Sequence, residues 1–285
     1  MKFNVKKFVI VLVSIMAVSF IISGVLFYMT GGIKAASITS GQIKANETFE
    51  TGGIEKIVIN TVSSDIRILP AEENKITVDF YGSITTNLGD NSPKLITDIK
   101  NGVLNISISY PKTFSIGLFN VSNLFLDVYI PKEFSQEVNT ASISGDINIE
   151  DIIGEKIILK TTSGDLAVKS TEAVEIQADS ISGDVNFDKV EGALKITSIS
   201  GEVNADMTTL SGDVAINTTS GEIKLILPSS SIFKFDLGSI SGDIDNNFDS
   251  KISFENERSM KGAVGDGVYE INISSVSGEI SISKE

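Results

Sequence analysis

A Ser-Gly-acid tripeptide recurs along this chain and constrains its fold more than any other feature. The separations between its glycines are 19, 19, 18, 20, 21 and 36 residues, and the last is close to two periods. The segment 62–66 (Val-Ser-Ser-Asp-Ile) resembles a degenerate early copy. A nearly fixed period of this length indicates one small structural unit that stacks on the next. The seven glycines are Gly145, Gly164, Gly183, Gly201, Gly221, Gly242 and Gly278.

Apolar residues keep fixed distances from each glycine, and the positions between them are mostly polar. This alternation with period 2 is typical of strands with one buried face. Two positions after the glycine stand Ile147, Leu166, Val185, Val203, Ile223, Ile244 and Ile280. Five before stand Thr140, Leu159, Ala178, Ile196, Ile216, Leu237 and Ile273, and seven before stand Val138, Ile157, Ile176, Leu194, Val214, Phe235 and Ile271. Two before stand the β-branched residues Ile143, Thr162, Ile181, Ile199, Thr219, Ile240 and Val276.

A single unit of this size cannot bury its apolar face alone, so consecutive units must stack. The sequence therefore predicts an all-β fold, a parallel β-solenoid (a single-stranded β-helix) with about 19 residues per coil and neighbouring coils about 4.8 Å apart. Glycine adopts backbone angles closed to other residues, and Ser and Asp bond to turn amides, so we interpret the tripeptide as the corner of each coil. An antiparallel sandwich also has short alternating strands, but it does not explain the fixed register.

The N-terminus predicts a membrane anchor. Residues 8–29 carry no charge and are mostly apolar. As a helix they would span about 33 Å, enough for a bilayer core of about 30 Å. Lys2, Lys6 and Lys7 precede them, which favours a cytoplasmic N-terminus and a single-pass protein of the cell membrane whose main domain is extracellular. The alternative is a cleaved signal peptide, with Ala35-Ala36-Ser37 as a cleavage site.

The pattern divides the chain into segments. Residues 1–29 form the cytoplasmic stub and transmembrane helix, and residues 30–45 form a linker. Residues 46–140 contain strand-like but poorly repeated sequence, which we interpret as an irregular β cap, since solenoid ends need one. Residues 141–285 are the regular repeats, interrupted at 246–268 by an insertion that we expect to be an extended coil or loop. The last coil, 269–283, is expected to close the stack.

Composition excludes several functions. Three of the 23 basic residues lie before residue 30, so the rest of the chain has 20 basic and 37 acidic residues and a net charge of −17. Such a surface repels nucleic acid. The chain has no Cys and no His, which removes disulfides, imidazole metal sites and His-dependent catalytic triads. Its only arginines, Arg67 and Arg258, are far apart. We therefore predict that it is not an enzyme, and polysaccharide cleavage is the remote alternative.

The acidic corner residues are the one candidate for a metal site. In a stack their carboxylates lie about 5 Å apart and repel one another unless they are solvated, screened or bridged by a cation. Calcium prefers such oxygen ligands. The simpler interpretation is a solvated turn carboxylate that accepts local amide bonds, and we favour it because calcium-binding repeats have denser Gly and Asp. No other cofactor is expected. The candidates are Asp146, Asp165, Asp184, Glu202, Glu222, Asp243 and Glu279.

Four segments together resemble a known family. They are the run of SGD and SGE corners, "LDVYIPKEF" at 126–134 leading into "ASISGDINIE", "LILPSSSIFKFDLGSISGDI" at 225–244, and "VGDGVYEINISSVSGEISI" at 264–282. They resemble the "putative adhesin" domain family of bacterial surface proteins, which includes LiaG-like, membrane-anchored members from Gram-positive envelope-stress operons. The resemblance covers most of residues 50–283. It implies a β-solenoid at the cell surface and carries no catalytic residues.

Two functions follow as hypotheses. The first is a non-catalytic surface scaffold or adhesin whose outward columns make many weak contacts with a cell-wall polymer, matrix or another envelope protein. The second is an accessory sensor or regulatory membrane protein in cell-envelope stress signalling. The sequence alone does not choose between them.

Overall fold

The computed structural model describes residues 39–86, 92–110 and 122–285. These residues form strands and one short 3-10 helix, η1 (Lys132–Phe134), which confirms the predicted all-β fold. No helix among them is long and apolar enough to cross a membrane. The predicted transmembrane segment at 8–29 lies outside the described residues.

The strands follow one another closely along the chain, and all are short except β1, β4, β12 and β13. They are β1 (Thr39–Glu50), β2 (Lys56–Asn60), β3 (Asp65–Ala71), β4 (Lys75–Thr86), β5 (Lys94–Lys100), β6 (Val103–Ser109), β7 (Ser122–Pro131), β8 (Glu137–Ser142), β9 (Ile147–Glu150), β10 (Ile153–Thr161), β11 (Leu166–Lys169), β12 (Glu172–Ser182), β13 (Val185–Ser200), β14 (Val203–Thr209), β15 (Val214–Ser220), β16 (Ile223–Leu227), β17 (Phe233–Ser241), β18 (Ile244–Asn246), β19 (Lys251–Asn256), β20 (Ser259–Val264), β21 (Tyr269–Ser277) and β22 (Ile280–Lys284).

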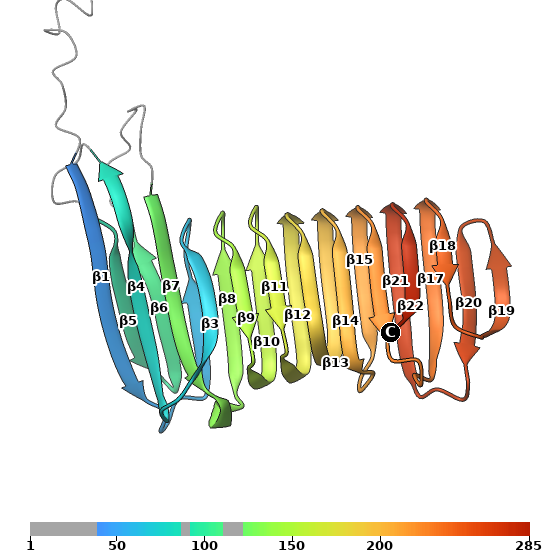
Figure 1. Ribbon diagram of the computed structural model, residues 1–285, viewed down its shortest axis with the longest axis horizontal. Coiled ribbons are helices and arrows are strands. Elements are labelled where there is room, and N and C mark those ends of the chain that lie inside the picture. The colour runs from blue at the N-terminus through green and yellow to red at the C-terminus, as the bar shows by residue number, and fades with distance from the viewer. Residues whose placement is uncertain (1–38, 87–91, 111–121) are drawn as a thin grey trace, which may run out of the picture.

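The middle of the molecule is a stack of coils, each made of a first strand, the Ser-Gly-acid corner and a second strand (Figure 1). The first strands pair in parallel in the order β8, β10, β12, the second half of β13 and β15. The second strands pair in parallel in the order β9, β11, the first half of β13, β14 and β16. Leu166, for example, pairs with Ile147 and Val185, which is the register that the repeat predicts.

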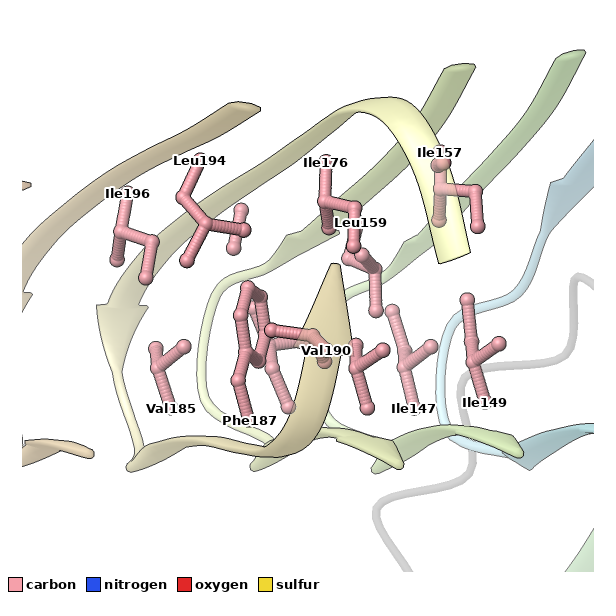
Figure 2. Packing of buried hydrophobic residues seen from close by; sticks show 14 of the residues in the cluster. Ile147, Ile149, Ile157, Leu159, Ile176, Val185, Phe187, Val190, Leu194 and Ile196 are labelled. Atoms are coloured by element: carbon pink, nitrogen blue, oxygen red, sulfur yellow. The ribbon is translucent and has the colours of Figure 1, made fainter. Parts of the chain in front are cut away.

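The core lies between these two layers of strands. Figure 2 shows Ile157, Leu159 and Ile176 of one layer facing Ile147 and Val185 of the other. All five side chains are fully buried. Burying one such side chain contributes about 1.5–3 kcal/mol, so the stacked columns can stabilise a chain that has no disulfide.

Near its N-terminal end the stack departs from sequence order. The coil formed by β2 and β3 is the first along the chain, but it lies between β6–β7 on one side and β8–β9 on the other. Ser64 occupies the place of the corner glycine in this coil, with its carbonyl oxygen beneath Gly145. The segment 62–66 is therefore a corner copy, and it lies inside the region expected to be an irregular cap.

The C-terminal end departs in the same way. The last coil, β21 and β22, is inserted between β15–β16 and β17–β18 (Figure 1). The expectation that this coil closes the stack is therefore wrong. The separation of 36 residues between Gly242 and Gly278 is not two periods along the stack, because these glycines belong to adjacent coils in reversed order.

Antiparallel strands form both ends of the stack. At the N-terminal end β1 pairs with β4, β4 pairs with β7, and β5 pairs with β6. Strand β1 begins at Thr39, within the segment expected to be a linker. At the C-terminal end β19 and β20 form a hairpin, and β20 pairs with β17. The insertion at 246–268 was expected to be a coil or loop, and that expectation is wrong for the hairpin residues, which cover the outer edge of β17.

Candidate functional site

The corner glycines form one continuous column, because each coil passes too close to the next to accommodate a side chain. A Cβ placed on Gly201, whose φ is +121°, would lie 2.2 Å from the carbonyl oxygen of Gly183. That distance is far below van der Waals contact, and the positive φ also favours glycine. The column runs in space through Ser64, Gly145, Gly164, Gly183, Gly201, Gly221, Gly278 and Gly242.

The acidic corner residues also stack, and the first of them form a hydrogen-bonded ladder. The amide of Asp165 donates to Asp146 Oδ1, and the amide of Asp184 donates to Asp165 Oδ1, each at 2.9 Å. The same bond joins the Asp146 amide to Asp65 (3.1 Å) and the Glu202 amide to Asp184 (2.9 Å). These carboxylates thus stabilise the turn of the next coil, whereas the simpler interpretation of the corner expected local bonds within the same turn.

The remaining acidic candidates continue the column. In the described part of the chain, the carboxylates of Glu202 and Glu222 accept no amide of the next coil, and each side chain is one methylene longer than that of Asp. Glu279 lies between Glu222 and Asp243. No group of three or more Asp or Glu side chains in the described residues is arranged to hold a metal ion. Calcium binding at the corners stays the less favoured interpretation.

A column of buried hydroxyl groups, three positions before each glycine, was missed by the sequence analysis. The Gly164 amide donates to Thr161 Oγ1 at 2.9 Å, and the Gly145 amide donates to Ser142 Oγ at 2.8 Å. These bonds satisfy turn amides that burial removes from water. The signal was present in the sequence, because every copy has Ser or Thr at this position. The column is Thr61, Ser142, Thr161, Ser180, Ser198, Thr218, Ser275 and Ser239, all at most 7% exposed.

The β-branched residues two positions before each glycine point outward instead of into the core. Their side chains form a row along the corner, which we call the corner ridge. Thr162 and Thr219 are exposed members of the row. The aliphatic members are 45–61% exposed, so the ridge is an apolar surface feature of the stack. In spatial order they are Val62, Ile143, Ile181, Ile199, Val276 and Ile240.

A second cluster lies on the outward face of the strands at the N-terminal end. Asp127 is buried, and Arg67 donates to it twice, Nε to Oδ1 at 2.7 Å and Nη2 to Oδ2 at 2.6 Å. The Tyr81 hydroxyl donates to Asp127 Oδ2 at 3.0 Å. The hydrogen bond with Asp127 raises the pKa of Arg67, and burial raises the pKa of Tyr81. Both groups therefore stay protonated at neutral pH and hold their geometry.

The comparison with protein families identifies the class of protein that this fold defines. Residues 54–283 match the model of the family described as Toastrack DUF4097. The match covers most of the chain, although it begins after β1, and the chain belongs to this family. This agrees with the family resemblance inferred from the corner repeats. No curated protein matches the chain.

Several solved structures are similar in part. A "putative cell adhesion protein" from Clostridium sporogenes is 19% identical with a TM-score of 0.38, over 86% of this chain and 100% of the other. A "putative adhesin" from Bacteroides fragilis is 13% identical with a TM-score of 0.44, over 86% and 97%. A "putative lipid binding protein" from Parabacteroides distasonis is 18% identical with a TM-score of 0.37, over 85% and 96%. At these scores the likenesses carry no argument about function.

Proposed function

We propose that this adhesin-like member of the Toastrack family is a non-catalytic scaffold or adhesin, held at the outside of the cell membrane by residues 8–29. The observation that carries the proposal is the corner ridge. Six aliphatic side chains, each about half exposed, and the exposed Thr162 and Thr219 line a single edge of the stack. A row of exposed, mostly aliphatic side chains with polar residues beside it is typical of an interaction site.

The parallel solenoid supplies the mechanism. Backbone pairing fixes the ridge side chains at about 4.8 Å intervals, so an extended partner that contacts one coil also reaches its neighbours. Each further contact is then intramolecular, and many weak contacts combine into a strong attachment. A linear cell-wall polymer, a matrix fibre or an extended segment of another envelope protein would fit such a row.

The acidic surface and the residue inventory support the same proposal. A net charge of −17 after residue 29 disfavours nucleic acid and anionic lipid as partners of the external domain. The chain has neither His nor Cys to act as nucleophile or base. The carboxylates of Asp146, Asp165 and Asp184 accept turn amides, which is a structural role.

The test combines location with binding. Protease added to whole cells should degrade the domain while the cytoplasmic stub survives. The full-length protein should bind at least one polymer in a set of purified peptidoglycan, teichoic acid and capsular polysaccharide. The double variant Ile181→Ser/Ile199→Ser should weaken that binding about tenfold, since it interrupts the ridge at two adjacent coils. The matched control is Val174→Ser, which removes an exposed aliphatic side chain outside the ridge.

Each contrary result would contradict a different part of the proposed function. A domain protected from protease on intact cells would overturn the proposed location. Equal loss of binding in the ridge variant and the Val174 control would overturn the role of the ridge. A domain that is exposed but binds none of the polymers would instead favour an accessory sensor in envelope-stress signalling.

A further inference from the structure

The outward face of β1, β4 and β7 differs from the rest of the same layer. Tyr81 and Phe125 are directly opposite one another on β4 and β7, and both are partly exposed. Their rings stack with centroids 5.5 Å apart and an interplanar angle of 26°. Farther along the layer, the outward positions carry small or polar residues such as Asn148, Ala167 and Asn186. The two rings are thus a local apolar platform on a polar face.

Two hollows lie against this platform and share Tyr81 and Lys44. The larger, about 550 Å³, extends over the platform, and the smaller, about 430 Å³, extends along β1 and β4. Volumes of this size are in the range of small-molecule sites. The outward residues that line them are Gln42, Lys44, Ser83, Asn123 and Phe125 for the first, and Lys44, Asn46 and Asp79 for the second, with Tyr81 in both.

The platform is held in place by Arg67 on the neighbouring strand β3. Arg67 forms the bidentate pair with buried Asp127, lies 5.9 Å from the centroid of the Phe125 ring and contacts the Tyr81 hydroxyl. Gly82 allows β4 and β7 to approach closely, since a Cβ there would lie 2.0 Å from the Asn123 carbonyl oxygen. A site whose side chains are fixed before binding loses little conformational entropy when a ligand arrives.

We infer that this surface, here called the aromatic platform, binds the uncharged sugar rings of a polysaccharide. One face of a pyranose presents C–H groups, which pack on the parts of the Tyr81 and Phe125 rings that their mutual stacking and Arg67 leave exposed. Its hydroxyl groups need both donors and acceptors around the ring, and amides, a hydroxyl, an ammonium and a carboxylate supply them here. The charges balance, because Lys44 is offset by Asp79, and Arg67 is paired with Asp127.

The geometry favours a chain of sugars over a single one and over a peptide. Four residue steps along β1, from Gln42 to Asn46, cover about 14 Å, enough for about two or three linked rings. A peptide is captured at an open strand edge through backbone bonds. These hollows lie instead over Tyr81 and Phe125, on the face of β4 and β7, and both of these strands are paired on both edges. Strand β1 is paired with β4 alone among the described residues, which is why the test includes a control peptide. The site is separate from the corner ridge and does not depend on it.

The test uses the full-length protein in a detergent without a sugar headgroup. The probes are cellohexaose and chitohexaose, which separate plain from N-acetylated sugars, measured by calorimetry and by tyrosine fluorescence. The wild type should bind at least one of them. Phe125→Ala should weaken the affinity about tenfold or more, the range of one lost stacking contact. Phe125→Tyr should restore it, because the ring returns.

The matched control is Tyr129→Ala, which removes an aromatic residue from the same strand and face but does not line either hollow. It should bind like the wild type, and circular dichroism should show the same fold in all variants. The inference is overturned if neither hexasaccharide binds the wild type, if Phe125→Ala binds as well as the wild type, or if only a control peptide of similar length binds. None of these outcomes affects the ridge, whose binding is measured separately with Ile181→Ser/Ile199→Ser.

Discussion

The middle of this molecule and its two ends need different residues to bury their cores, although the same layers of strands run through both. In the middle, every coil packs on both sides against another coil with the same sequence pattern. Alternating aliphatic residues, a buried hydroxyl and a corner glycine are therefore enough to specify each coil. At the ends one side has no such neighbour. Antiparallel strands and larger side chains cover the end coils, because no further repeat is available to pack against them.

Aromatic residues mark the difference. Between residues 137 and 227 the only aromatic residue is Phe187. At the N-terminal end Phe80 is fully buried, and at the C-terminal end Phe233 packs against Phe235 and Phe248, with ring centroids 6.1 and 5.1 Å away. One large ring can fill space that a neighbouring coil would otherwise fill. The same preference for rings at the end leaves Tyr81 and Phe125 on the surface, where the aromatic platform lies.

The stacking order shows a second difference. In the middle, sequence neighbours are spatial neighbours, whereas at each end an internal segment of the chain lies outside a terminal coil. The coil of β2 and β3 is covered by β6–β7, and the coil of β21 and β22 is covered by β17–β18. A terminal coil that is paired on both sides cannot fray alone, because its release breaks two sets of backbone bonds.

The largest expected effect comes from deleting the last coil, residues 269–285. If the coils stacked in sequence order, this deletion would only shorten the stack. Because β21 and β22 lie between two other coils, we expect it to abolish cooperative folding. Thermal unfolding followed by circular dichroism would then show no sigmoidal transition, and the protein would be sensitive to protease.

The control for this deletion is a loss of similar size at the outermost position. Replacing 251–264 with a short Gly-Ser linker removes the β19–β20 hairpin, which pairs through β17 and with no other described strand of the stack. This variant should keep a cooperative transition at a lower midpoint. If the deletion of 269–285 were tolerated as well as the loss of the hairpin, the reversed order of the coils would be contradicted.

The next largest effect is expected at a corner glycine in the middle. Gly201→Ala places a methyl group 2.2 Å from the Gly183 carbonyl oxygen and forces Ala into a positive φ. We expect a loss of about 3 kcal/mol or more in the free energy of unfolding, measured with urea. Gly52→Ala is the matched control, since its Cβ meets no atom within 4 Å, and it should change stability by less than about 0.5 kcal/mol. Similar losses in both variants would contradict the close approach of the coils.

The middle of the fold could be predicted from the sequence because every repeat has the same alternation of buried and exposed positions around its corner glycine. Parallel register follows from aligned columns, and the buried column of Ile147, Leu166, Val185 and Val203 was inferred correctly. The corner ridge could also have been found. Positions seven, five and three before the glycine have the same parity and face inward, so position two before it must face outward.

The ends could not be predicted in the same way. Nothing in the sequence of 269–283 distinguishes a coil that closes a stack from one that is inserted into it, because both bury the same columns. The β19–β20 hairpin lacks strong alternation, and all its β19 residues are exposed. The aromatic platform depends on strands far apart in sequence: Lys44, Tyr81 and Phe125 meet only because β4 pairs with both β1 and β7.

An intermediate effect is expected from the buried hydroxyl column. Thr161→Val keeps the shape of the side chain but leaves the Gly164 amide without its acceptor, so we expect a loss of about 1–3 kcal/mol. Thr140 is the matched comparison, because it is equally buried but its Oγ1 has no hydrogen-bond partner in the structure. Thr140→Val should be neutral or stabilising. Urea unfolding of both variants tests this, and a larger loss at Thr140 than at Thr161 would contradict the role of the column.

The smallest effect is expected at the junction between the N-terminal end and the middle. Glu137 lies between Lys56 and Lys156 in register, and its 2.9 Å bond from Lys56 Nζ lowers its pKa. A carboxylate with a lowered pKa contributes stability above its unfolded pKa of about 4.3, and loses it as the pH falls through the lower folded value. Glu137→Gln should therefore cost about 0.5 kcal/mol at pH 7 and nothing at the acid end.

Urea unfolding of Glu137→Gln and the wild type at pH 7 and near pH 3 measures this dependence. Glu172→Gln at an exposed position is the control and should show no difference at either pH. This result tests how the N-terminal end is attached to the repeats, because the bond from Lys56 to Glu137 joins β2 of the end to β8, the first strand of the repeats. A loss that persisted unchanged at low pH would mean that Glu137 contributes through packing, and that charge plays no part in joining the end to the repeats.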